Sequence, residues 1–151
     1  MRIPAALLAA SLLALLAPPL ICEIPSPMTL HASSDPLEWK VAASIPAGPL
    51  YHVVWKDPVS RCIQALVRLP PGFRTKPHPH KFNETVVVLR GKLKVKVGNA
   101  ERVLRRGDYA VFPVESPHEV SVAGRWEVQM LVTLVSPDES EYKTLEGLFG
   151  G

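Results

Sequence analysis

The chain has 151 residues, with 17 Lys or Arg against 14 Asp or Glu, so its formal net charge is +3 at pH 7. This length fits one folded domain. Such a small positive excess argues against binding to nucleic acid.

The first 22 residues differ in composition from the rest of the chain. Arg2 is their one charged residue, residues 5–17 contain only Ala, Leu and Ser, and Pro18 and Pro19 follow. This pattern is typical of a secretory signal peptide. We therefore predict that residues 1–22 direct export and that the protein is secreted or periplasmic. The alternative is that residues 1–22 stay attached as a membrane anchor.

Cys22 and Cys62 are the two cysteines. Cys22 stands where a lipid-modified cysteine stands in a bacterial lipoprotein, but Ile21 precedes it where a small residue is wanted. We expect contact with a membrane only if the leader is uncleaved or Cys22 is lipidated. In an oxidising compartment, Cys22 can pair with Cys62 if both are retained. Without Cys22, we expect Cys62 to be a small buried apolar residue.

Residues 23–36 are rich in Pro and Ser and predict an extended leader. Strand signals then recur between turns that contain Gly and Pro, which predicts an all-β sandwich or barrel. We expect this domain to cover residues 37–136. In the C-terminal tail, 137–151, residues 138–149 are expected to form one or two helical turns. The predicted strands are residues 39–44, 51–55, 61–69, 84–90, 92–97, 101–104, 109–112, 119–122 and 126–135.

Three potential metal ligands lie close together before and within one predicted strand. His78, His80 and Glu84 occupy positions i, i+2 and i+6, and alternate residues of a strand point to the same side. His118, after a later strand signal, can complete the set. Imidazole and carboxylate ligands together suit a divalent transition metal such as Fe, Mn, Ni, Cu or Zn. Burying these groups without a cation would leave polar atoms unsatisfied, so we predict one bound metal.

The spacing of these residues resembles the first sequence motif of the cupin superfamily. Gly72, His78, His80, Glu84 and Gly91 match this motif at every fixed position. The resemblance extends over residues 66–134. It implies a double-stranded β-helix, or jelly-roll, barrel. It also implies that His78, His80, Glu84 and His118 are the metal ligands.

The second cupin motif is partly present. Gly107, Pro113 and His118 keep its spacing, but Glu115 replaces the usual glycine and Val122 replaces the usual asparagine. Neither difference affects a ligand. Glu115 lies in the turn before His118, where glycine usually relieves a backbone constraint, so the conformation of this turn is in question.

Residues that point to the same side of their strands as the ligands are expected to line a small apolar cavity beside the metal. This lining is predicted to contain Phe82, Val86, Val120 and Met130. Few side chains are suited to act as an additional acid or base, and Glu115 and Gln129 are the candidates.

These features predict an exported metal-binding cupin with a small-molecule substrate or ligand. One interpretation is a metalloenzyme of the dioxygenase type, which rests on analogy between folds. The alternative is a non-catalytic module that binds or senses a small ligand or a metal. We also expect a homodimer, because small cupins commonly pair through edge strands and exposed strand edges need covering.

Overall fold

The computed structural model describes residues 36–42, 45 and 48–149. The predicted signal peptide, most of the leader and Cys22 lie outside these residues. Export, cleavage and pairing of Cys22 with Cys62 therefore stay predictions; Cys62 itself is buried. Among the described residues, no helix is both long and apolar enough to span a bilayer.

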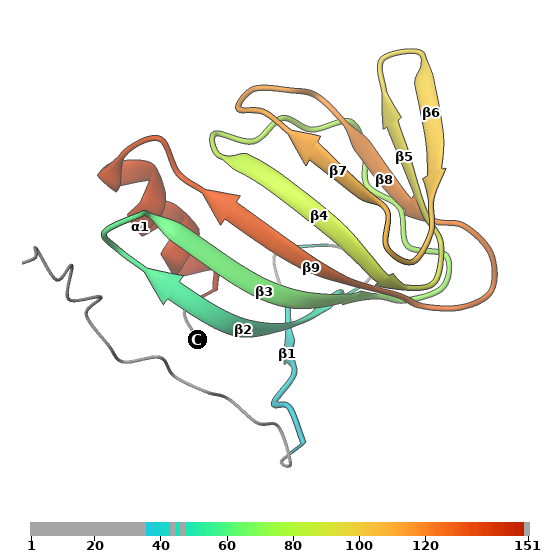
Figure 1. Cartoon of the computed structure of the whole chain (residues 1–151), viewed down its shortest axis with the longest axis horizontal. Helices are drawn as coiled ribbons and strands as arrows, with labels where there is room; N and C mark the ends of the chain where they lie inside the picture. The colour runs from blue at the N-terminus through green and yellow to red at the C-terminus, as the bar shows by residue number, and fades with distance from the viewer. Residues whose placement is uncertain (1–35, 43–44, 46–47, 150–151) are drawn as a thin grey trace, which may run out of the picture. The chain divides into compact units, whose positions relative to one another are not determined.

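The described chain folds mainly into antiparallel β-strands, which confirms the predicted all-β class (Figure 1). Eight of the strands follow the predicted signals closely, whereas the first is a two-residue strand among the described residues. The elements are β1 (Lys40–Val41), β2 (Leu50–Asp57), β3 (Cys62–Leu69), β4 (Asn83–Arg90), β5 (Leu93–Val97), β6 (Ala100–Leu104), β7 (Tyr109–Phe112), β8 (Glu119–Val122), β9 (Val128–Val135) and α1 (Glu139–Leu148).

The strands form two sheets of a jelly-roll fold. One sheet has the order β1-β2-β3-β9-β4-β7, and the other has the order β6-β5-β8. Figure 1 shows β2, β3, β9, β4 and β7 side by side, with β5, β6 and β8 as a separate group. Val86 and Val88 of the large sheet and Leu93 and Val95 of the small sheet belong to one buried cluster. The core therefore lies between the two sheets.

The loop between β3 and β4 extends the small sheet beyond β8. Its Thr75 amide donates to the Val120 carbonyl at 2.9 Å, and the Val122 amide donates to the Phe73 carbonyl at 3.0 Å. Isolated antiparallel bridges join Arg74 to Ser121 and His78 to His118. Backbone pairing thus fixes the positions of His78 and His118, two of the predicted ligands.

Gly91 closes the first motif for a steric reason. Its φ is 84°, and a Cβ atom at this position would collide with the carbonyl oxygen of Glu127. Only glycine fits both the left-handed conformation and the close approach of the chain that leads into β9.

The C-terminal helix is longer than expected and belongs to the core. Asp138 caps it by accepting a hydrogen bond from the Glu141 amide at 2.9 Å. Tyr142 and Leu145 are buried in the same cluster as the strands. The structured region therefore continues beyond residue 136, because the helix contributes apolar surface that the sheets need.

Replacement of Leu145 by Ala is expected to lower the free energy of unfolding by about 2–4 kcal/mol, because it opens a cavity in the core. Leu148 is the matched control, since its side chain is 55% exposed. Leu148→Ala should change stability by less than about 0.5 kcal/mol. Urea unfolding of both variants measures the difference, and equal effects would show that α1 does not contribute to the core.

Candidate metal centre

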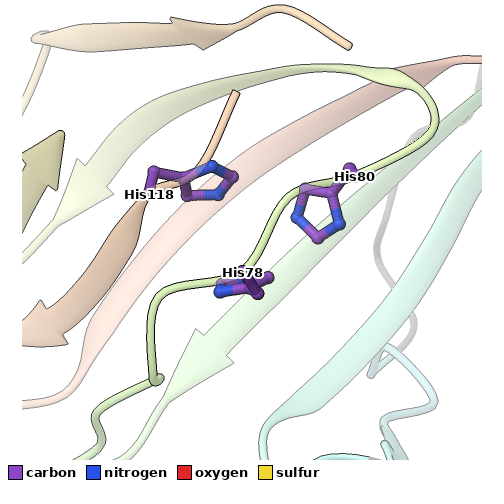
Figure 2. Close-up of side chains that lie close together, drawn as sticks. All are labelled: His78, His80 and His118. Carbon is purple, nitrogen blue, oxygen red and sulfur yellow. The ribbon is translucent and has the colours of Figure 1, made fainter. Parts of the chain in front are cut away.

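Three histidines meet at one end of the small sheet. His78 and His80 lie in the loop before β4, and His118 directly precedes β8. Figure 2 shows the three imidazoles gathered between these two segments. The candidate ligand atoms of the three residues all lie within 4.8 Å of one another. The structure therefore brings together three of the four residues predicted to hold a metal.

Backbone hydrogen bonds hold two of the histidines opposite each other. The His78 amide donates to the His118 carbonyl at 3.1 Å, and the His118 amide donates to the His78 carbonyl at 3.2 Å. This pair of bonds is the pattern of one antiparallel bridge. It fixes the separation of the two Cα atoms and leaves both imidazoles on the same side.

Hydrogen bonds to carbonyl groups set the tautomers of His78 and His118. Nδ1 of His78 lies 2.8 Å from the Lys76 carbonyl oxygen, and Nδ1 of His118 lies 2.9 Å from that of Ser116. Because a carbonyl oxygen only accepts, each Nδ1 must carry the proton. Each Nε2 is then left with a free lone pair, which is the form in which imidazole usually binds a metal.

Glu84, on β4, supplies a fourth donor. Its Oε2 lies 3.0 Å from Nε2 of His80 and 3.5 Å from Nε2 of His118, and its side chain is 13% exposed. Burial would raise the pKa of Glu84, but the neighbouring His118 and His80 imidazoles hold the pKa at about 2. The carboxylate is therefore an anion at neutral pH, positioned against the imidazoles.

The four side chains fit a divalent cation. Among the described residues, the buried Glu84 Oε2 accepts no hydrogen bond of good geometry, despite the short contacts. A buried anionic carboxylate that faces imidazole nitrogens requires a positive charge beside it, which either a proton or a metal ion can supply. Three nitrogen donors and one carboxylate are the donor set that Mn, Fe, Ni, Cu or Zn accepts.

A proton competes with a metal ion for the position between Glu84 and the imidazoles. Burial would lower the pKa of His118, but the Glu84 carboxylate outweighs burial and raises that pKa. Burial lowers the pKa of His78, so its imidazole is neutral at neutral pH. The negative charge that favours a proton on His118 also favours a metal ion bound to its Nε2.

Two phenyl rings hold the imidazoles in place. Phe112 stacks on His118 with ring centroids 3.9 Å apart and planes 10° apart. Phe82 stacks on His80 with centroids 4.6 Å apart and planes 15° apart. Phe82 was predicted to lie beside the site. Phe112 was not singled out, although the pairing of its strand with β4, opposite Glu84, explains its position.

The other predicted lining residues are Val86, Val120 and Met130. Val86 and Met130 are buried in the core, and Val120 packs against it. A cavity of about 240 Å³ lies between β5, β6 and β7. Phe112 lines this cavity and also touches His118, so it separates the cavity from the site.

Gln129 lies far from the candidate centre. Glu84 pairs with Leu134 on β9, and Gln129 is five residues earlier on the same strand. At the rise of a β-strand, this separates them by about 16 Å. The Gln129 side chain donates to Glu127 at 2.7 Å. The structure gives Gln129 no place in a reaction at the histidines.

The backbone of Glu115 contacts the loop that carries His80. Its amide donates to the His80 carbonyl at 2.7 Å, and its side chain is exposed. Its φ is 59°, a left-handed conformation that is unfavourable for a residue with a Cβ atom. The turn before His118 thus has the geometry for which cupins usually use glycine. In this chain Glu115 positions the His80 loop, and the contacts give its carboxylate no partner at the site.

Because of this φ, Glu115→Gly is expected to be about 1 kcal/mol more stable than Glu115→Ala, with metal content unchanged. The comparison with Ala removes the side-chain carboxylate in both proteins and isolates the backbone effect. Thermal unfolding measured by circular dichroism gives the difference. If Ala proved as stable as Gly, the turn would not be left-handed in solution.

The chain is similar to known proteins in both sequence and structure. A family model with the description "Cupin domain" matches residues 65–134. KdgF from Halomonas sp. is 20% identical, with a TM-score of 0.58 over 68% of this chain and 91% of that chain. The protein TT1209 from Thermus thermophilus is 27% identical, with a TM-score of 0.52 over 62% of this chain and 89% of that chain.

A cupin-like protein from Thermotoga maritima is 23% identical, with a TM-score of 0.53 over 64% of this chain and 84% of that chain. A search of curated proteins gave no match. The likenesses in structure show the fold, and the matched sequence segment contains every fixed position of the first motif, together with His118. Together they confirm the resemblance to which the spacing of these residues pointed.

Proposed function

The chain carries a cupin domain at residues 65–134, and on this basis we propose that it binds one divalent transition metal. Nε2 of His78, His80 and His118 and the carboxylate of Glu84 would be the ligands. The observation that carries this proposal is the buried Glu84 Oε2, which lies 3.0 Å from Nε2 of His80 and 3.5 Å from Nε2 of His118 without a hydrogen bond of good geometry among the described residues. A bound ion with open positions supplies oxygen chemistry if it is redox-active, or Lewis-acid chemistry if it is zinc.

We further propose that the site handles a small organic molecule. Phe82 and Phe112 place apolar rings directly on two of the imidazoles. Apolar walls with a few convergent polar groups are typical of small-molecule sites. A dioxygenase reaction is the enzymatic form of this proposal. It needs no external reductant, because both atoms of O₂ enter the substrate and the substrate supplies the electrons.

A non-catalytic binding module is the second candidate. The described side-chain contacts of the three imidazoles are with one another, with Glu84 and with the two phenyl rings. Catalysis beyond the metal usually requires a positioned acid or base. Of the two candidates for that role, Glu115 has an exposed side chain and Gln129 donates to Glu127. These contacts favour binding over catalysis for any reaction that needs a proton transfer.

The proposed place of action is the periplasm or the outside of the cell. The composition of residues 1–22 supports it, because a basic start, an apolar run and a proline break are typical of a signal peptide. An exported domain would take up its metal and its ligand outside the cytoplasm.

Replacement of His80 by Ala is expected to abolish stoichiometric metal binding, because it removes one of three nitrogen ligands. The loss of bound metal should also lower the melting temperature. His52→Ala is the matched control, since His52 lies on β2, with Nδ1 2.8 Å from the Glu38 carbonyl oxygen. Elemental mass spectrometry of both purified variants measures the metal. Full metal content in His80→Ala would refute the ligand assignment.

Oxygen consumption distinguishes the enzyme from the binding module. Protein loaded in turn with Fe, Mn or Cu is mixed with small phenols and thiols in an oxygen electrode, with His80→Ala as the control. Continued consumption by the wild type alone would support a dioxygenase. A ligand that raises the melting temperature without oxygen consumption would support the binding module.

A further inference from the structure

The cavity between β5, β6 and β7 lies where the edges of the two sheets meet. β6 is an edge strand of the small sheet, and β7 is an edge strand of the large sheet. Residues 105–108 join these strands in a tight turn, in which the Arg105 amide donates to the Asp108 carboxylate at 2.8 Å. Val97 and Val111, which line the cavity, are 41% and 55% exposed. The cavity is therefore open to molecules from the solvent.

Two alanines leave this space unfilled. Ala110 of β7 pairs with the buried Val86, and Ala100 of β6 pairs with Val97 of β5. Directly paired residues point to the same side of a sheet, so Ala110 carries only a methyl group on the side that faces the core. Valine, leucine and phenylalanine side chains form much of the remaining wall. The wall therefore suits the apolar part of a small molecule.

Arg102 brings a positive charge to this apolar wall. It pairs with the buried Val95, so its side chain starts on the inner side of the small sheet, and it lines the cavity. Among the described residues, Arg102 forms no ion pair, because the neighbouring Glu101 lies 3.0 Å from Lys94. Its Nη1 donates to the Glu101 carbonyl oxygen at 3.0 Å. The other guanidinium N–H groups can donate to a ligand.

We propose that this cavity binds a small apolar carboxylate, with the hydrocarbon part among the apolar side chains and the carboxylate on Arg102. A guanidinium suits a carboxylate because it donates two parallel hydrogen bonds to it. The cavity is smaller than the roughly 300–1,000 Å³ of pockets for drug-sized ligands, so it fits a single ring or a short aliphatic chain. Its lining contains none of the four proposed metal ligands. The proposal therefore does not depend on the metal.

The charge of the lining selects a ligand with one negative charge. Arg102 is the one charged residue among the side chains that line the cavity. A dianion, such as phosphate or a dicarboxylate, would place an additional charge without a partner beside apolar groups. A neutral molecule of the same shape would keep the apolar contacts but lose the hydrogen bonds between two charged groups. A monocarboxylate uses both parts of the cavity.

The test is a titration of the full chain, freed of metal with EDTA, with benzoate and with its neutral analogue benzamide. Removal of metal excludes binding of the carboxylate to an ion at the histidines. Methyl signals in NMR spectra locate the ligand: Val95, Leu104 and Ala110 should show saturable shifts, and Leu145 should not, because α1 and β6 lie on opposite sides of the domain in Figure 1. Benzamide should bind at least about tenfold more weakly than benzoate, because it lacks the charge.

Variants test the two parts of the cavity separately. Arg102→Ala should weaken benzoate binding at least about tenfold and leave benzamide binding unchanged. Arg106→Ala is the matched control, because it removes the same charge from an exposed residue outside the lining, and it should bind benzoate as the wild type does. Ala110→Leu fills the cavity and should abolish binding of both compounds.

Circular dichroism of each variant verifies folding. The absence of saturable shifts with benzoate in the metal-free wild type would overturn the proposal, as would equal affinities for benzoate and benzamide. Unchanged benzoate binding in folded Arg102→Ala or in folded Ala110→Leu would also overturn it. Because every titration uses metal-free protein, these results are independent of whether the histidines bind a metal.

Discussion

The antiparallel bridge between His78 and His118 is the constraint on which the site depends. Two backbone hydrogen bonds, at 3.1 and 3.2 Å, align a loop before β4 with the residue that leads into β8. Residues far apart in the chain thereby present their imidazoles to the same space. The bridge continues the pairing of residues 73–75 with β8, so the loop behaves as an additional edge strand of the small sheet. The ligand positions thus follow from sheet structure, which is more rigid than an isolated loop.

The candidate centre also joins the two sheets. Glu84 belongs to β4 of the large sheet, while His78 and His118 are held by the small sheet. Phe112, from β7 of the large sheet, stacks on His118 and adds an apolar contact across the same junction. A metal bound by all four ligands would connect the sheets directly. Without a cation, a proton on an imidazole would have to balance Glu84 at this junction, so occupancy and stability are expected to be coupled.

The sequence predicted the fold class and the cluster of histidines well, for different physical reasons. Strand periodicity and turn residues located β2 to β9, because these signals are local. The proximity of His78 and His118 is not local: a later strand signal made His118 a possible ligand, and the resemblance to cupin motifs assigned it to the site. The contacts of Phe112 and the packing of α1 were missed, since each depends on strand register or on core space that no short segment encodes. Of the residues predicted by parity to line the site, Phe82 stacks on His80, whereas Val86 and Met130 are buried in the core and Val120 packs against it.

The most direct test of the metal assignment is anomalous X-ray scattering from a crystal of the protein, recorded at the absorption edges of Mn, Fe, Ni, Cu and Zn. The account predicts one strong peak among His78, His80 and His118, about 2.0–2.2 Å from their Nε2 atoms and bound also to Glu84. A crystal grown from metal-loaded protein with no peak there, or with the peak at another place, would contradict it. In that case the four side chains would be held together by a shared proton, and the domain would be a cupin without a metal.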